Sequence, residues 1–245
     1  MSSTGAFGCF GTGAPAFMLR NMKRLQKTIG YDFRDPSLLK KALTHSSYVN
    51  EHGLSHGDCN ERLEFLGDAA LELSASRVLF DQYPDESEGS LSRLRSKLVC
   101  RAALADVARQ LDLGKYLLLG KGEESTGGRE RESILENTVE ALIGAIYLDS
   151  GFANAKEFVE RFVTNDIEHR KFFYDSKTIL QERVQQGGQH QLEYRLAGEE
   201  GPDHDKRFTA EVLIDGVVRG TGTGRSKQSA EQQAAYQALI NTDKE

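Results

Sequence analysis

The sequence is poor in cysteine and contains no long apolar run. Its three cysteines, Cys9, Cys59 and Cys100, are odd in number and never spaced as Cys-x-x-Cys. A disulfide framework and a zinc site are therefore not expected, and a reducing cytoplasm is the default location. No stretch approaches the roughly 18 uninterrupted apolar residues that a membrane-spanning helix needs, which argues against a membrane protein.

An excess of positive charge is also missing. The formal net charge is −6 and the pI is about 5.6, which argues against a general binder of polyanions. If nucleic acid is the partner, a few clustered cations must hold it against this acidic background. What is present is an ordinary globular composition: 245 residues, 38% hydrophobic and 28% charged, enough for one large domain or two modest ones.

The N-terminal two thirds of the chain lacks the alternating pattern of strands. Residues 1–20 carry no charge before Arg20, and four glycines interrupt them. They therefore lack the basic start and the continuous apolar core of a secretory signal. We expect them to form a disordered extension. From residue 25 to residue 166 the apolar residues recur with helical spacing. This block is predicted to be all-α.

The pattern changes after residue 170. A helix is predicted at 176–186, strands at 192–197, 207–214 and 217–222, and a last helix at 227–240. Asp215-Gly216 is a hairpin turn signal, and Ser226 is suited to capping the last helix. The predicted parts are a disordered extension (1–20), an all-α domain (21–170), a linker (171–175) and a small α+β domain of order α-β-β-β-α (176–243).

An acidic stripe is the most informative local feature. At about 100° per residue, Glu61, Glu64 and Asp68 fall on one narrow side of a helix, with Phe65 and Leu71 on its flanks. The opposite, core-facing side is predicted to hold Leu63, Leu66, Ala70 and Leu73. Acids on a helix are usually solvated surface, and like charges four residues apart repel each other. The apolar flanks favour placed carboxylates that bind a cation.

A second helix complements the first. Residues 134–148 are apolar almost all round, which is typical of a helix buried in a core. Asn137 and Glu140 share one side of it, and Gly144 follows one turn later, where a facing helix could approach closely. A salt bridge is the simple explanation of a Glu in such a helix. Together with the acidic stripe, a shared divalent ion explains it better, and ligands that are all oxygens indicate Mg²⁺ or, as a substitute, Mn²⁺.

Residues 61–69 read ERLEFLGDA, which resembles the signature of the bacterial ribonuclease III family. The resemblance extends to LTHSSY at 43–48, EGSLSRLR at 88–95 and TVEALIG at 138–144. The C-terminal block resembles the double-stranded RNA-binding domain that follows the nuclease domain in these enzymes. Together the similarity covers roughly residues 22–242.

The resemblance implies an activity and an assembly. The family hydrolyses double-stranded RNA to 5′-phosphate and 3′-hydroxyl ends by a two-metal mechanism, in the processing of precursor ribosomal RNA and in the maturation or decay of messenger and small RNA. Its nuclease domain is an all-α homodimer, and neither a membrane nor an organic cofactor is involved. Metal ions lower the pKa of attacking water and stabilise the leaving oxygen, which explains the need for oxygen ligands.

By motif position, the resemblance also implies the site residues. Glu64, Asp68, Asn137 and Glu140 would hold the metals, with Asp68 and Glu140 as the catalytic pair. Glu61 and Glu88 would position substrate. One departure concerns residue 137, which is usually Asp in the family and is Asn here. An amide oxygen ligates Mg²⁺ without bringing charge, so a higher Mg²⁺ requirement is expected.

Duplex RNA is recognised through its shape, its phosphates and its 2′-hydroxyls. The C-terminal domain offers three candidate contacts: a helix face, a loop histidine, and the basic start of the last helix. The residues are Gln181, Glu182 and Gln185, then His204, and finally Arg225, Ser226 and Lys227.

Two other functions compete. A protein that grips duplex RNA without cutting it is favoured only by Asn137, and the intact set Glu64, Asp68 and Glu140 argues against it. A diiron or other redox carboxylate protein would need Glu-x-x-His pairs on helices, and the sequence contains none.

Overall fold

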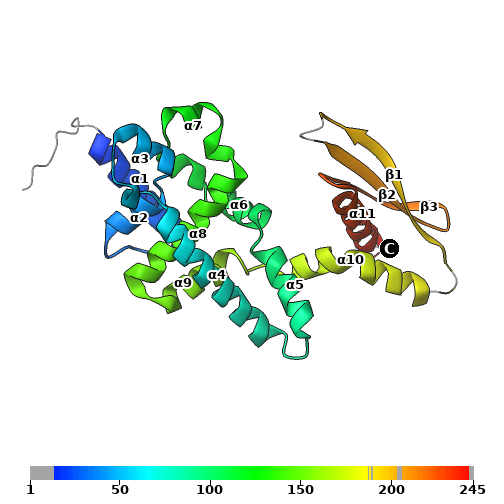
Figure 1. Cartoon of the computed structure of the whole chain (residues 1–245). Helices are drawn as coiled ribbons and strands as arrows, with labels where there is room; N and C mark the ends of the chain where they lie inside the picture. Colours follow the sequence, from blue (N-terminus) through cyan, green and yellow to red (C-terminus); the bar gives the residue numbers. More distant parts are fainter. Residues whose placement is uncertain (1–13, 187, 189, 203–205, 243–245) are drawn as a thin grey trace, which may run out of the picture. The chain divides into compact units, whose positions relative to one another are not determined.

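The computed structural model describes residues 14–186, 188, 190–202 and 206–242, and its contacts divide the chain into two units after Asn165. In the first unit the described residues form helices without a named strand, which confirms the all-α prediction (Figure 1). The helices are α1 (Ala14–Ile29), α2 (Pro36–Ala42), α3 (Ser46–His52), α4 (Glu61–Gln82), α5 (Glu88–Leu98), α6 (Arg101–Gln110), α7 (Lys121–Ser125), α8 (Glu132–Ser150) and α9 (Phe152–Phe162). Short 3₁₀ turns lie at η1 (His56–Asp58), η2 (Leu113–Tyr116) and η3 (Gly128–Glu130).

Local signals set several helix boundaries. Asp35 caps α2 by accepting a hydrogen bond from the Ser37 amide, with Pro36 in the first turn. Ser87 caps α5 by accepting from the Ser90 amide. The extension predicted at 1–20 is wrong in its second part, because α1 begins at Ala14; residues 1–13 lie outside the described range. Residues 14–20 contain one proline in the first helical turn, where it is compatible with a helix.

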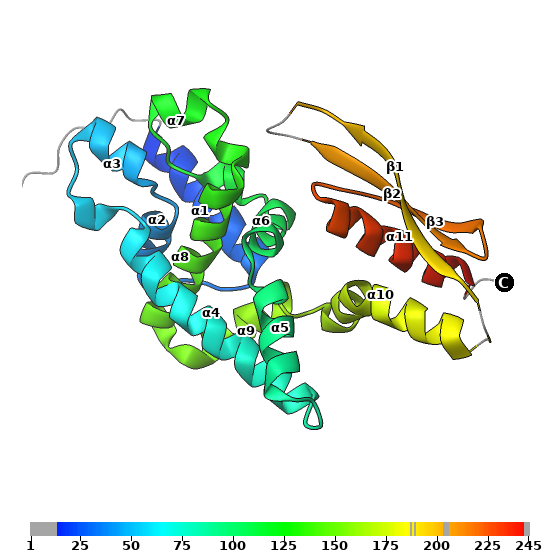
Figure 2. The same ribbon diagram turned by 45° about the vertical axis from the view of Figure 1, so that its right-hand side comes forward.

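Helix α8 is the centre of the first unit. Ten of its residues are buried, and α4 crosses it (Figures 1 and 2). The C-terminal end of α8 is tied to the α1–α2 connection, because Asp149 accepts hydrogen bonds from the Tyr31 hydroxyl at 2.6 Å and from the Arg34 and Asp35 amides at 2.9 Å. This helix therefore provides a fixed support for the side chains that it carries.

The buried side of α4 differs from the predicted one. Leu63 and Ala70 are buried as expected, but Leu73 is exposed and Leu66 is only half-buried. The core-facing stripe is Leu63, Gly67, Ala70, Leu71, Ser74, Ala75, Val78 and Leu79. The helix has a second apolar stripe that is exposed in the described part of the chain. Helical periodicity alone does not tell which of two apolar stripes faces the core.

Two glycines bring the main chains of α4 and α8 into contact. A Cβ on Gly67 would overlap the Glu140 carbonyl oxygen and lie 2.6 Å from its carbon. A Cβ on Gly144 would overlap the Leu63 carbonyl oxygen and lie 3.0 Å from the Gly67 nitrogen. The close approach expected at Gly144 is therefore present, and Gly67 is its counterpart on α4.

The second unit is a three-stranded antiparallel sheet with two helices. Its elements are α10 (Ile167–Gln186), β1 (Leu192–Glu200), β2 (Arg207–Ile214), β3 (Val217–Gly224) and α11 (Lys227–Thr242). The strand order is β1-β2-β3, and β2 pairs with β3 from Phe208 opposite Gly224 to Ile214 opposite Val217. The α-β-β-β-α prediction is confirmed. Both Asp215 and Gly216 have positive φ, at 51° and 76°, as tight hairpin turns require.

Helix α11 packs closely on the sheet because β3 carries glycines beneath it. A Cβ on Gly220 or Gly222 would overlap the main chain of α11 around Ala230 and Ala234. The core between sheet and helices contains Leu180, Val184, Val212, Ala235 and Leu239, among others. As expected, Ser226 caps α11, since its hydroxyl accepts a hydrogen bond from the Ser229 amide at 3.1 Å.

The linker expected at 171–175 is wrong. These residues are part of α10, which begins at Ile167 rather than at residue 176. No glycine or proline interrupts this stretch, so nothing in its local preferences ends a helix. Ser176 is buried inside the helix, where its hydroxyl donates to the Phe173 carbonyl at 2.7 Å. Within the described part of the chain, none of the helices combines the length and apolar character needed to cross a membrane.

The glycine contact predicts a large effect of Gly67→Ala. The new methyl group would force α4 away from α8, so we expect the free energy of unfolding to fall by about 3 kcal/mol or more. Gly122→Ala is the matched control, because a Cβ on Gly122 in α7 would meet nothing within 4 Å. That variant should change stability by less than about 1 kcal/mol. Chemical denaturation compares the two, and equal midpoints would contradict the contact.

Candidate active site

Four polar side chains from α4 and α8 meet beside the glycine contact. Glu64 and Asp68 come from α4, and Asn137 and Glu140 come from α8. The Asn137 side chain is close enough to Glu64 to lower the pKa of its carboxyl, and the charges of Asp68 and Glu64 both act on the Glu140 carboxyl. The structure therefore brings together the four residues that the sequence suggested as metal ligands.

The main-chain contact explains this convergence. The Glu140 carbonyl lies against Gly67, which follows Glu64 by three residues and precedes Asp68 by one. Residues three or four apart share one face of a helix. Backbone packing, rather than interactions among the acids themselves, thus places Glu140 of α8 next to the turn of α4 that carries Glu64 and Asp68.

The cluster is electrostatically unfavourable when no cation is bound. The pKa of Glu140 is raised to about 8, first by burial and then by the negative charges of Asp68, Glu136, Glu64 and Glu72. The pKa of Glu64 is also raised, first by burial and then by the charge of Glu61, while the hydrogen bond from Asn137 opposes the change. A cation at this position would relieve both effects.

Neighbouring acids have cationic partners that the central ones lack. Glu136 pairs with Arg101, with 2.6 Å between Oε2 and Nε, and Glu72 pairs with Arg95 at 2.8 Å. Among the described residues, no lysine, arginine or histidine forms an ion pair with Glu64, Asp68 or Glu140. The salt bridge considered as the simple explanation of Glu140 is therefore not found in the described part of the chain.

The donor set fits a hard divalent ion. Its members offer carboxylate and amide oxygens only, which suit Mg²⁺ or Mn²⁺ rather than a soft metal. The raised pKa of Glu140 supports this fit, because a divalent ion would replace the proton that this carboxyl otherwise retains near neutral pH. The pKa of Glu64 is shifted in the same direction.

Sequence reasoning missed Glu72 and Glu136, although both affect the cluster. Each acts on the pKa of Glu140 and is itself held by an arginine. Their positions follow the same helical periodicity: Glu72 is one turn after Asp68, and Glu136 is one turn before Glu140. Extending the acidic stripe by one turn on each helix would have found them.

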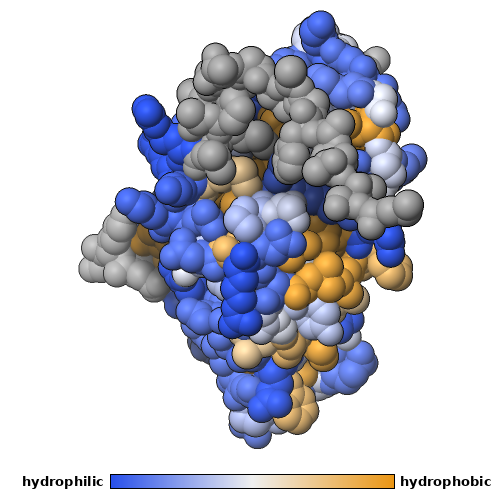
Figure 3. All heavy atoms as spheres, turned by 90° about the vertical axis from the view of Figure 1, so that its left-hand side faces the viewer, coloured by the Kyte–Doolittle hydropathy of each residue, from blue (hydrophilic) through white to orange (hydrophobic). Residues whose placement is uncertain are grey.

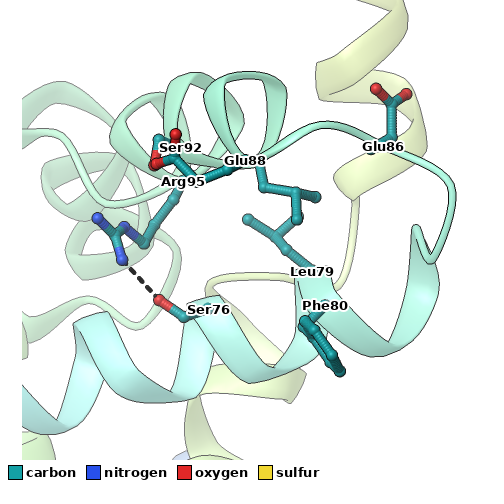
Figure 4. Close-up of a pocket in the computed structure, with 8 residues that line it drawn as sticks. Ser76, Leu79, Phe80, Glu86, Glu88, Ser92 and Arg95 are labelled. Carbon is teal, nitrogen blue, oxygen red and sulfur yellow. Dashed lines mark hydrogen bonds between the residues drawn. The ribbon is translucent and has the colours of Figure 1, made fainter.

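The two acids expected to position substrate lie at different places. Glu61 is the first residue of α4 and is half-exposed, and its negative charge helps to raise the pKa of Glu64. Glu88 is the first residue of α5 and accepts a hydrogen bond from the Ser92 hydroxyl at 2.7 Å. It lines a 490 Å³ hollow between α4 and α5, together with Phe80 and Arg95 (Figure 4). No interaction recorded among the described residues joins Glu88 to the four clustered side chains.

The candidate RNA contacts of the second unit are accessible where they are described. Gln181, Glu182 and Gln185 are exposed on α10, and Arg225, Ser226 and Lys227 are exposed at the start of α11. Arg225 and Lys227 therefore lie at the N-terminus of a helix, an arrangement that suits phosphate. His204 lies outside the described residues.

Helix α4 also carries an exposed apolar stripe, formed by Phe65, Leu73 and Phe80. Their side chains are 82%, 58% and 70% exposed. Phe65 adjoins Glu64, so apolar and acidic surfaces meet on one helix. Figure 3 shows a face of the molecule on which hydrophobic side chains gather among hydrophilic ones. Large apolar side chains exposed along one helix face are the kind of surface that another protein can cover.

Both units are similar to known protein families. Residues 35–167 match the family model described as Ribonuclease-III-like, and residues 176–241 match the double-stranded RNA binding motif. The chain is 46% identical over 223 residues to ribonuclease 3 of Listeria welshimeri, covering 90% of this chain and 97% of that protein. It is 49% identical over 222 residues to ribonuclease 3 of Pelotomaculum thermopropionicum, covering 89% and 92%.

A solved structure is similar to the first unit. The nuclease domain of ribonuclease III from Campylobacter jejuni superposes with a TM-score of 0.55 at 41% identity. The match covers 59% of this chain and 97% of that one.

The raised pKa of Glu140 predicts a pH-dependent stability of the metal-free protein. Below about pH 4.5 the carboxyl is protonated in both states, so it contributes nothing to the pH dependence. Between about pH 4.5 and 8 the unfolded chain releases a proton that the native chain retains, so the free energy of unfolding falls as the pH rises. Glu140→Gln removes this titration.

We therefore expect wild type to lose about 1–3 kcal/mol more stability than Glu140→Gln between pH 5 and pH 8, since one pKa unit corresponds to about 1.4 kcal/mol and solvent screening reduces the total. Urea unfolding in EDTA at the two pH values measures this difference. Parallel pH profiles for the two proteins would rule out the shifted carboxyl.

Proposed function

The chain belongs to the ribonuclease III family, and from this we propose that it hydrolyses double-stranded RNA at the carboxylates of α4 and α8. The observation that carries the proposal is the meeting of Glu64, Asp68 and Glu140 without a cationic partner among the described residues. The first unit is then the endoribonuclease, and the second unit, whose residues match a double-stranded RNA binding motif, holds the duplex.

Glu64, Asp68, Asn137 and Glu140 would hold a pair of Mg²⁺ ions, with Mn²⁺ as a substitute. Such ions supply a nucleophilic oxygen at neutral pH and stabilise the charge that develops on the scissile phosphate. The protein's own part is to hold the four oxygen ligands on two rigid helices. Asp68 and Glu140 are assigned to the chemistry by their positions in the family motifs, and of the neighbouring charges Asp68 has the largest effect on the Glu140 carboxyl. Cleavage leaves a 5′-phosphate and a 3′-hydroxyl.

Substrate contacts extend beyond the metal ligands. We assign Glu61 and Glu88, at the starts of α4 and α5, to positioning the RNA. On the second unit we assign the exposed side chains of α10 and of the start of α11 to the minor groove and the phosphates. These are Gln181, Glu182, Gln185, Arg225, Ser226 and Lys227, and His204 is assigned by its loop position alone.

We propose that the first unit pairs with a second copy of itself. The support is the apolar stripe of Phe65, Leu73 and Phe80, whose side chains are exposed in the described part of the chain. The Campylobacter jejuni structure is described as having a region involved in dimer formation. A homodimer with one site in each subunit would cut both strands of a duplex.

The proposed setting is the cytoplasm. The two described cysteines, Cys59 and Cys100, are free thiols, which suits a reducing compartment. Within it we assign the enzyme to precursor ribosomal RNA and to the maturation or decay of messenger and small RNA, as in its family.

Binding of duplex RNA without cleavage is the second candidate function, and Asn137 is the residue that favours it. An amide in place of a carboxylate lowers the negative charge available to a metal. The remaining carboxylates oppose this reading, because a protein that only grips RNA has no need for buried acids with raised pKa values.

Glu140→Gln should separate cutting from binding. It removes a metal ligand without changing shape, so we expect cleavage of long duplex RNA in Mg²⁺ to fall by at least about 10³-fold, which corresponds to about 4 kcal/mol of transition-state stabilisation. Affinity for the same duplex, measured by gel shift in Ca²⁺ or EDTA, should stay within about twofold of wild type. The matched control is Glu157→Gln, an exposed carboxyl on α9, which should cut normally. Loss of binding together with cutting would contradict the assignment of Glu140 to the cleavage step.

Asn137→Asp tests the departure from the usual ligand set. A fourth carboxylate increases the charge that holds the ions, so the Mg²⁺ concentration for half-maximal cleavage should fall roughly several-fold. Cleavage rates titrated against Mg²⁺ give the midpoint of each protein. Asn137→Ala is the matched comparison, because it removes the amide oxygen and should shift the midpoint upward. Equal midpoints for wild type and Asn137→Asp would discard the idea.

A further inference from the structure

The turn that precedes α4 brings together three side chains of different metal-binding chemistry. His56 is the first residue of η1, Cys59 directly follows η1, and Glu61 is the first residue of α4. We propose that His56 Nδ1, Cys59 Sγ and the Glu61 carboxylate bind one transition-metal ion of the Zn²⁺ class. This site is separate from the oxygen ligands described above.

The distances fit ligands of a single tetrahedral ion. His56 Nδ1 lies 3.7 Å from Cys59 Sγ and 3.7 Å from Glu61 Oε2, and the ligand atoms of all three lie within 4.8 Å of one another. Zn–S bonds of about 2.3 Å and Zn–N or Zn–O bonds of about 2.0–2.1 Å imply separations of about 3.3–3.6 Å between ligand atoms. Two of the three separations therefore need only a few tenths of an ångström of adjustment.

The backbone holds the first two ligands in register. In a 3₁₀ helix, side chains three residues apart lie one above the other, and His56 and Cys59 have this spacing. A capping box fixes the turn, because the Ser55 amide donates to Asp58 Oδ2 at 3.2 Å and the Ser55 hydroxyl accepts from the Gly57 amide at 3.3 Å. The ligands are thus positioned before an ion binds, which lowers the cost of ordering them.

The interactions among the three side chains are weak by themselves. The His56–Glu61 separation of 3.7 Å is too long for a direct hydrogen bond, and His56 is largely exposed. The Cys59 thiol makes a 3.1 Å contact with the His56 carbonyl oxygen, which a thiolate ligand would give up. Protein contacts therefore do not account for the convergence as well as a shared ion does.

The donor set selects a different metal from the neighbouring cluster. A thiolate and an imidazole favour Zn²⁺ and related ions over Mg²⁺, whereas the set around Glu140 contains oxygens only. His56 faces solvent, so an ion can enter and a water can complete the coordination, while Cys59 is 1% exposed. The site shares Glu61 with the residues assigned to positioning RNA, but metal binding at His56 and Cys59 does not require the nuclease activity.

Cobalt binding tests the site through the thiol. The full-length chain, kept reduced with a phosphine and supplied with excess Mg²⁺, is titrated with Co²⁺. We expect a near-ultraviolet thiolate-to-cobalt charge-transfer band that saturates at one ion per chain and disappears when Zn²⁺ is added. Coordination by oxygen ligands alone gives no such band, so the readout excludes the carboxylate cluster. Absence of the band in the wild-type chain would overturn the proposal.

Single variants identify the ligands. Cys59→Ser should abolish the band, and His56→Ala, a change at an exposed side chain that leaves the core intact, should weaken Co²⁺ binding by at least about 10–100-fold, the loss seen even when outer-shell partners are removed. Cys9→Ser and Cys100→Ser are matched controls and should bind as wild type does. A band that survives Cys59→Ser, or unchanged affinity in His56→Ala, would contradict the site.

Discussion

The contact between the main chains of α4 and α8 is the constraint on which the site depends. Gly67 and Gly144 have no side chains at the crossing, so each helix rests on a carbonyl group of the other. This places Glu140 between the two acids of α4, whose spacing the helix itself determines. The geometry of the carboxylates is thus largely a property of the backbone.

The protein accepts an electrostatic cost at this place. Glu140 is partly buried among like charges, and its pKa rises to about 8, whereas the flanking Glu72 and Glu136 are neutralised by arginines. A fold selected for stability alone would pair or replace the central carboxylates. Local strain that a bound cation relieves is typical of a functional site.

Periodicity predicted much of the fold and the convergence of the site. The position of Gly144 on the acid-bearing side of its helix indicated the close crossing, and Asp215-Gly216 indicated the hairpin. Periodicity failed where a helix has two apolar stripes. It placed Leu73 in the core because an exposed apolar stripe and a core-facing stripe have the same spacing in the sequence. It also could not show that η1 aligns His56 with Cys59, since a 3₁₀ turn leaves almost no trace in a sequence.

Phe65 adjoins Glu64 on α4, with its ring largely in water. Any surface that covered this ring would also remove solvent from the neighbouring carboxylate and lower the local dielectric constant. Proton and ion affinity at the acids would then vary with protein concentration, because association and titration act on adjacent atoms. For a chain that associated through this face, dilution would alter the chemistry of the site.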